Sequence, residues 1–224
     1  MKKYVLGLVI AVAVFVAANA YADVNVYTES GNYGSGATND RYLPSGWMGD
    51  TGDIAMTDAF ATNPHSGATS TQVKYGGFSY SGTNGWAGVY WQQPEGNWGA
   101  NPGLNLSGAT SLQFYARGQN GGEKVTIGGG GIVGSPNSDS FKVFGTYTLN
   151  SVWTGYSLSL SGKDMKSVIG GLYWSAAKND NPNGLTFYLD DVVYKGNVVP
   201  EPSSLLLLGS GVLGMLSFGK KKKA

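Results

Sequence analysis

The chain has 224 residues, a formal net charge of +1 at pH 7 and no cysteine. Residues 1–22 and 197–224 hold six of its 15 basic residues and one of its 14 acidic residues, so the interior carries nine basic against 13 acidic residues, a net charge of −4. This balance argues against a nucleic-acid partner, because phosphate binding needs an excess of Lys and Arg. The lack of cysteine excludes a disulfide framework.

The first 22 residues have the three-part organisation of a secretory signal peptide. Lys2 and Lys3 precede an apolar run from Tyr4 to Ala18, and small residues follow up to Ala22. The run has 15 residues, fewer than the roughly 20 that span a bilayer as a helix. We therefore expect residues 1–22 to form a signal helix that is cleaved after Ala22, the alternative being an uncleaved membrane anchor.

Residues 23–196 are predicted to form one domain, since their number fits a single domain rather than two. Short runs of β-forming residues recur between clusters of Gly, Asn, Ser and Pro, and no long segment keeps a helical period. Strands are expected at 24–28, 71–75, 87–93, 111–117, 124–127, 141–149, 154–160, 169–174 and 185–194.

Alternation along these runs predicts two-faced strands. Ala87, Val89 and Trp91 share one parity, so we expect them to face a core, while the residues between them face outward. Low charge with abundant Gly, Tyr and Trp is typical of an all-β extracellular module. The predicted fold class is therefore all-β, a single jelly-roll β-sandwich flanked by an N-terminal signal helix and a C-terminal hydrophobic helix.

Two segments lack a clear strand pattern. Residues 33–64 are rich in Gly and Asp, and we expect either a long ordered binding loop or a mobile insertion there. Residues 128–131 are four consecutive glycines. Neither a Lys-Ser/Thr pair nor a helix follows them, which disfavours a phosphate loop and favours a tight crossing or a sheet edge where side chains do not fit.

The densest group of aromatic and amide side chains lies between residues 86 and 98. Aromatic faces stack on sugar rings and amides bond to sugar hydroxyls, so this group predicts a sugar-binding platform, extended by outward residues of another strand. The alternative is that most of these aromatics fill a core or cover its edges, as we expect for Trp91. The candidate ligand-binding residues are Trp86, Tyr90, Gln92, Glu95, Asn97, Trp98, Tyr115 and Arg117.

Acidic residues near both ends of the domain suggest a structural calcium site. Glu29 follows the first expected strand, and Asp190 and Asp191 lie in the last. If these strands are neighbours, carboxylates from both could converge with backbone carbonyls around a hard cation. The two aspartates have opposite parities, so at most one of them is a ligand, and Glu29 and Asp190 are the candidates. The alternative is that all three are solvated loop acids.

An enzyme is the less favoured class. A glycosidase needs two carboxylates roughly 5 to 10 Å apart, and Glu95, Glu123, Asp139 and Asp190 are present without any pattern that pairs them. His65 is the only histidine, so a zinc site would lack its usual ligands and a catalytic triad would have to use this residue. We therefore predict no catalytic residue, and no cofactor beyond the calcium ion.

The C-terminus combines three parts in a fixed order. Pro200, Glu201 and Pro202 keep the chain extended beyond the domain, an apolar run covers residues 203–218, and four lysines stand at 220–223. An apolar run of 16 residues is marginal for a full membrane span, and the lysines should stay cytoplasmic by the positive-inside rule. The alternative is an ordinary single-pass C-terminal anchor.

This tail, which fills residues 197–224 together with its linker, resembles the PEP-CTERM sorting signal of Gram-negative bacteria that make extracellular polysaccharide. The resemblance implies processing by an exosortase, a membrane transpeptidase-like enzyme. It also implies a transient anchor in the inner membrane and a final place on the outer surface or in the extracellular matrix, with the hydrophobic end discarded as in a GPI signal.

Within the domain, residues 63–75, 85–99, 104–132 and 181–194 resemble secreted jelly-roll domains similar to carbohydrate-binding modules. Their ending TFYLDD is typical of the last strand of such modules, where an Asp often helps to hold calcium. The resemblance implies a non-enzymatic domain that binds extracellular polysaccharide. Two alternatives stay open, namely a structural or adhesive biofilm-matrix protein without sugar specificity and, less favoured, a polysaccharide-active enzyme.

Overall fold

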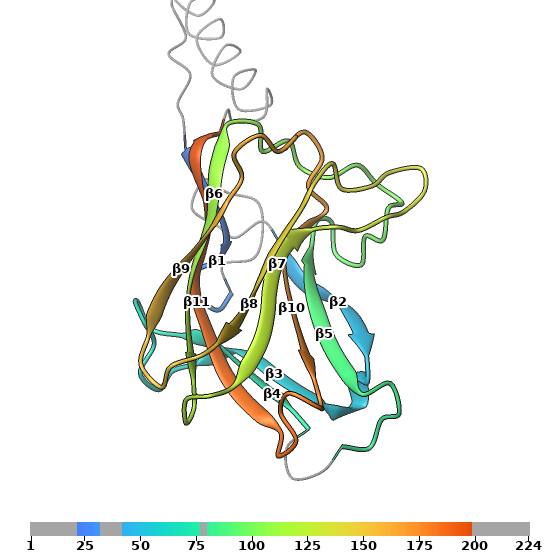
Figure 1. The fold of residues 1–224 in the computed structure, drawn as a ribbon. Helices are drawn as coiled ribbons and strands as arrows, with labels where there is room; N and C mark the ends of the chain where they lie inside the picture. The colour runs from blue at the N-terminus through green and yellow to red at the C-terminus, as the bar shows by residue number, and fades with distance from the viewer. Residues whose placement is uncertain (1–21, 32–41, 77–79, 199–224) are drawn as a thin grey trace, which may run out of the picture.

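A computed structural model of the chain describes residues 22–31, 42–76 and 80–198, which form two antiparallel sheets packed face to face (Figure 1). The six-stranded sheet runs β3 (Ile54–Phe60), β4 (Ser70–Tyr75), β11 (Leu185–Val198), β6 (Ala109–Gly118) and β9 (Thr154–Ser159), and β1 (Ala22–Tyr27) also pairs with β11. The five-stranded sheet runs β2 (Leu43–Gly49), β5 (Trp86–Gln92), β10 (Gly170–Ala177), β7 (Lys124–Gly130) and β8 (Lys142–Thr148). A short 3-10 helix, η1 (Thr51–Asp53), connects β2 to β3.

The core lies between the two sheets and is built from the alternating apolar residues of each strand. Ala87, Val89 and Trp91 of β5 are buried in it, as predicted. From the facing sheet, Phe187 of β11 packs edge-on against Trp174 of β10 with ring centroids 5.4 Å apart. Because each strand contributes only one parity to this core, the other parity is left on an outer face.

The predicted all-β sandwich is confirmed, and each of the nine expected strands coincides with a strand of the structure. The interpretation of residues 33–64 as a loop or insertion was wrong where the structure describes them, since β2 and β3 occupy most of residues 43–60. Both are edge strands that pair with a single neighbour. An edge strand needs less hydrophobic alternation and tolerates Pro and Gly, as in the LPSGWMG sequence of β2.

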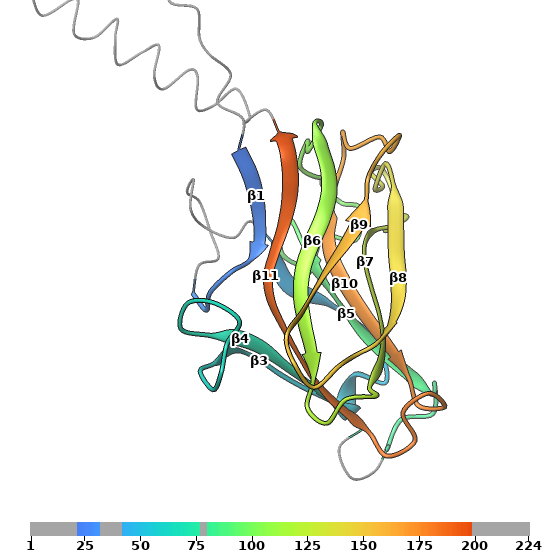
Figure 2. The ribbon, with the colours of Figure 1, turned by 60° about the vertical axis from the view of Figure 1, so that its left-hand side comes forward.

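The two ends of the domain lie side by side. Ala22 of β1 pairs with Val198 of β11, and Figures 1 and 2 show both strand ends at the same end of the sandwich. The predicted signal helix, apart from Ala22, and the predicted C-terminal helix lie outside the described residues. Within residues 22–31, 42–76 and 80–198, no helix is long and apolar enough to cross a membrane.

Candidate functional site

The outer face of the five-stranded sheet carries an ordered row of residues that crosses all five strands. Strand register places one outward residue of each strand in line, and the row contains two buried tyrosines and an exposed phenylalanine. The row comprises Gly46, Tyr90, Tyr173, Gly128 and Phe144. The adjacent row along the strands comprises Met48, Gly88, Ser175, Thr126 and Thr146.

Aromatic rings dominate one end of this face. The ring of Tyr90 lies 4.9 Å from that of Tyr173 and 5.9 Å from that of Trp98, centroid to centroid. Tyr90 and Tyr173 pack with Ile132 and Ile169 in a small apolar cluster that is separate from the main core. Burial raises the pKa of Tyr173 to about 12, so this phenol stays neutral at physiological pH.

Glycines make room for these rings. A Cβ atom at Gly128 would lie 2.8 Å from Cε1 of Tyr173, and one at Gly46 would lie 2.8 Å from Cβ of Tyr90. Real Cβ contacts are not found at such distances, so larger residues at either position would displace the tyrosines. The run at 128–131 thus provides a close crossing, as predicted from its composition, and it lies next to the edge strand β8.

A shallow pocket of about 190 Å³ opens at the other end of the same face. The indole of Trp86 lines it together with the hydroxyl-bearing residues Thr126, Thr146 and Ser175. At its rim Lys124 and Asp180 form an exposed ion pair with 3.7 Å between nitrogen and oxygen. An aromatic wall beside several hydroxyl groups can stack on a sugar ring and exchange hydrogen bonds with its hydroxyls.

The exposed large aromatic residues of the described chain gather on this sheet. Trp86 is 40% exposed, Trp98 46% and Phe144 56%, and these three belong to β5, the loop after it and β8. Trp47 of the edge strand β2 is also exposed, but it pairs with the inward-facing Val89 and so does not belong to the outer face. Exposed aromatics concentrated on one face are typical of a binding surface.

Gln92 and Asn97, two predicted ligand-binding residues, are buried and support the loop that carries Trp98. The Gln92 side-chain amide donates to the carbonyl of Asn97 at 3.0 Å and its Oε1 accepts from the Ser45 hydroxyl at 2.9 Å. The Asn97 carboxamide oxygen accepts from the backbone of Gly99 at 3.0 Å. These two residues position Trp98, whereas the predicted residue Glu95 lies exposed at the turn.

Asp139 joins two further loops beside the aromatic end of the face. Its carboxylate accepts hydrogen bonds from the backbone N–H groups of Ile132, at 2.7 Å, and of Ile169 and Gly170. Burial nevertheless raises the pKa of Asp139 to about 6, against the lowering effect of these three donors. Ionisation of this carboxyl group therefore costs the folded state free energy.

This raised pKa gives an expected pH dependence of stability. An Asp in an unfolded chain has a pKa of about 4. The stabilisation that protonated Asp139 gives the folded state is therefore fully present below that pH and is lost as the pH rises through about 6. We expect Asp139→Asn to shrink the fall in melting temperature between pH 4 and pH 7, measured by circular dichroism. Asp164→Asn, at an exposed acid, is the control. Equal pH profiles for wild type and Asp139→Asn would contradict this assignment.

The structure separates Tyr115 and Arg117 from the other predicted platform residues. Both point outward from β6, which belongs to the six-stranded sheet, so they lie on the opposite side of the sandwich. The ring of Tyr115 is stacked under that of His65 at 3.4 Å between centroids. The predicted platform therefore occupies two faces, with Trp86, Tyr90 and Trp98 on one and this pair on the other.

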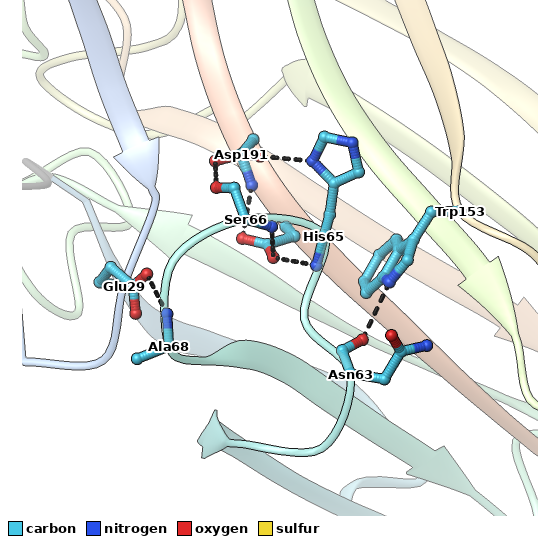
Figure 3. A network of polar contacts seen from close by, with 8 residues as sticks. Glu29, Asn63, His65, Ser66, Ala68, Trp153 and Asp191 are labelled. Atoms are coloured by element: carbon cyan, nitrogen blue, oxygen red, sulfur yellow. Dashed lines mark hydrogen bonds and ion pairs between the residues drawn. The ribbon is translucent and has the colours of Figure 1, made fainter.

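The predicted calcium ligands Glu29 and Asp190 both accept hydrogen bonds from the loop between β3 and β4, and Figure 3 shows Glu29 beside Ala68 of this loop. Glu29 accepts from the backbone of Ala68 at 2.7 Å, and Asp190 accepts from the backbone of His65 at 2.8 Å. The neighbouring Asp191 binds the His65 ring at 2.6 Å. Over the described ranges no group of three or more His, Cys, Asp or Glu side chains is placed to hold a metal ion, and calcium stays an untested prediction.

Sequence reasoning missed several residues of the outer face. Tyr173, Phe144 and the pocket hydroxyls were not among the candidates, although the outward parity of Phe144 can be derived from its alternation with Val143 and Gly145. For Tyr173 the alternation with the buried Leu172 and Trp174 gives the same signal. Alternation does not reveal the strand order, and it is the strand order that places Tyr173 and Phe144 in the same row as Tyr90.

Comparison with solved structures shows that this fold is shared with carbohydrate-binding modules. A family 30 carbohydrate-binding module aligns with a TM-score of 0.55 at 15% identity, covering 82% of this chain and 93% of that one. The family 30 module of a cellulosomal cellulase of Clostridium thermocellum aligns with a TM-score of 0.53 at 15% identity, covering 78% and 98%. A family 11 module of another cellulosomal cellulase of that organism gives 0.50 at 14% identity, covering 81% and 99%.

Residues 198–222 match the family described as the PEP-CTERM protein-sorting motif. The predicted resemblance is thus confirmed in both parts, and the chain joins a β-sandwich like that of carbohydrate-binding modules to a PEP-CTERM sorting motif. The motif indicates export and begins at the last residue of β11. The search of curated proteins finds no match to this chain.

Proposed function

We propose that this protein is exported, processed by an exosortase, and binds extracellular polysaccharide along the outer face of its five-stranded sheet. The observation that carries the proposal is the placement of exposed Trp86, Trp98 and Phe144 on one face, beside a pocket lined with hydroxyl groups. The fold shared with carbohydrate-binding modules agrees with it. The face is open and shallow, so single-site binding should be modest and retention should depend on many copies at a surface.

The proposed maturation follows from the two ends of the chain. Residues 1–22 would act as a signal peptide, 23–196 as the binding domain, and 197–224 as linker and sorting signal, with Pro200, Glu201 and Pro202 as the motif read by the exosortase. The tail would anchor the protein in the inner membrane until it is processed. The mature domain would then lie on the outer surface or in the extracellular matrix of a Gram-negative bacterium.

Two other functions fit parts of this picture. A matrix or adhesion protein without sugar specificity would share the sorting tail and the fold. A glycosidase needs two carboxylates flanking the bond, whereas the described residues that line the pocket include one carboxylate, Asp180, which is already paired with Lys124. The pocket therefore favours binding over catalysis.

Affinity electrophoresis of the isolated domain against a panel of soluble polysaccharides tests the proposal. We expect retardation by at least one neutral polysaccharide, with no release of reducing ends on long incubation. Glu95→Gln should bind as the wild type does, since Glu95, although a candidate from sequence, does not line the pocket on which the proposal rests. Retardation by no polysaccharide would favour the matrix protein, and turnover that Glu95→Gln abolishes would favour the enzyme.

A further inference from the structure

The six-stranded sheet carries a second set of ligand-type side chains on its own outer face. We propose that this face, centred on Arg117 and Lys74, is a separate binding site for a carboxylated polysaccharide. The site lies on the opposite side of the sandwich from the face described above and does not depend on it.

Arg117 is held between two aromatic rings. Its guanidinium carbon lies 3.8 Å from the ring centroid of Tyr188 and 5.1 Å from that of Trp153. The indole N–H of Trp153 donates to the carbonyl of Asn63 at 3.0 Å, which fixes the ring (Figure 3). The guanidinium plane is thus oriented in advance, and its Nε is buried without a hydrogen-bond partner among the described residues.

No carboxylate neutralises Arg117 or Lys74 within residues 22–31, 42–76 and 80–198, where the ion pairs join other residues. The carboxylate of Asp190 accepts from the backbone of His65, and that of Asp191 binds the His65 ring and the Ser66 hydroxyl (Figure 3). A buried guanidinium N–H that lacks an acceptor costs free energy. Arg117 as a whole stays partly exposed, so a carboxylate ligand can pair with its terminal N–H groups in the fork geometry that Arg favours.

Register places Lys74 on the same face as Arg117. Tyr188 pairs with Arg117 on one side and with Gln72 on the other, and Lys74 is the next outward residue of β4 after Gln72. Strand spacing and rise put the Cα atoms of Lys74 and Arg117 about 12 Å apart. The site therefore presents two cations from strands that are not direct neighbours, which suits a polymer with repeated carboxylates.

Amide groups complete the surface between the two cations. The Gln72 amide donates to the Tyr188 hydroxyl at 3.2 Å, and that hydroxyl donates to Oε1 of Gln119 at 3.3 Å. These bonds orient the carboxamides toward the outer face, where they can exchange hydrogen bonds with sugar hydroxyls. Cation, aromatic ring and amides together favour an acidic sugar over a simple anion.

A domain with sites on opposite faces would link two polysaccharide chains. Each protein copy would then crosslink two polysaccharide chains. Crosslinks from many copies would hold a matrix together more strongly than the affinity of a single site suggests. This consequence needs both faces, whereas acidic-polymer binding needs only the face around Arg117.

Binding of the isolated domain to polygalacturonate, measured by isothermal titration calorimetry, tests the site. We expect the wild type to bind, with affinity that falls as salt rises, and Arg117→Gln with Lys74→Gln to weaken binding by at least about 10-fold. Lys163→Gln with Lys166→Gln removes two exposed charges from another loop and should change binding by less than about 2-fold. Fully methyl-esterified polygalacturonate, which keeps the backbone and loses the charge, should bind far more weakly.

Any of four results would overturn the site. These are no binding by the wild type, equal binding of the esterified polymer, equal losses in the two double variants, and equal binding of polyglutamate. Arg117 packs against two rings, so the double variant can lose stability. If its melting temperature is lowered, the single variant Lys74→Gln replaces it in the test, and we expect that variant to weaken binding about 3-fold. Trp86→Ala with Trp98→Ala should leave binding to polygalacturonate intact, which separates this site from the proposed function.

Discussion

Replacing both Trp86 and Trp98 by Ala is expected to weaken polysaccharide binding by roughly 30- to 1000-fold, since each exposed ring contributes about 1 to 2 kcal/mol by stacking. The two residues lie near opposite ends of β5, more than about 10 Å apart, so their effects should add. Affinity electrophoresis or calorimetry on the polysaccharide found in the panel measures the loss.

Trp47→Ala is the matched control for this double variant. Trp47 is as exposed as Trp86 and equally large, but its parity directs it away from the outer face. We expect it to change affinity by less than about 2-fold. Losses of the same size for Trp47→Ala would show that exposed indoles bind sugar wherever they lie, and the face would lose its special role.

Trp174→Ala is expected to lower the free energy of unfolding by about 3 to 5 kcal/mol, because it leaves a cavity between the two sheets. Trp174 is fully buried and packs against Phe187. Its indole N–H has no hydrogen-bond partner among the described residues, so the residue acts through its volume and not through polar contacts. Urea denaturation followed by circular dichroism measures the change.

Trp174→Phe distinguishes volume from hydrogen bonding. It keeps most of the ring and removes a donor that has no partner, so we expect a cost well below that of Trp174→Ala. A cost equal to that of the alanine variant would mean that the indole N–H makes a contact on which the core depends. Polysaccharide binding by Trp174→Phe should be unchanged, because Trp174 faces the core and not the outer face.

The strands could be predicted from sequence because alternation is a local property. It identified the core parity of β5 and β6, and it failed for β2 and β3 because edge strands are constrained by one neighbour only. Alternation could not tell which sheet a strand joins. Trp86 and Arg117 both point outward from their strands, yet these strands lie in different sheets. The residues predicted to form one platform therefore lie on two faces of the sandwich.

The acidic residues illustrate a second limit of sequence reasoning. The condition for a shared calcium site, that the first and last strands are neighbours, is met by the pairing of β1 with β11. The use of Glu29 and Asp190 as acceptors for the loop between β3 and β4 could not be foreseen, because it depends on backbone N–H groups. Backbone donors carry no sequence signature, and they compete with a cation for the same carboxylate oxygens.

The indole N–H resonances of the six tryptophans provide the most direct test of the outer face of the five-stranded sheet as the polysaccharide site. In an NMR titration of the isotope-labelled domain with a neutral polysaccharide that it binds, we expect the signals of Trp86 and Trp98 to shift. Those of Trp91 and Trp174, buried between the sheets, and of Trp153 on the opposite face should stay in place. A shift of Trp153 alone, with Trp86 and Trp98 unmoved, would contradict the proposed site.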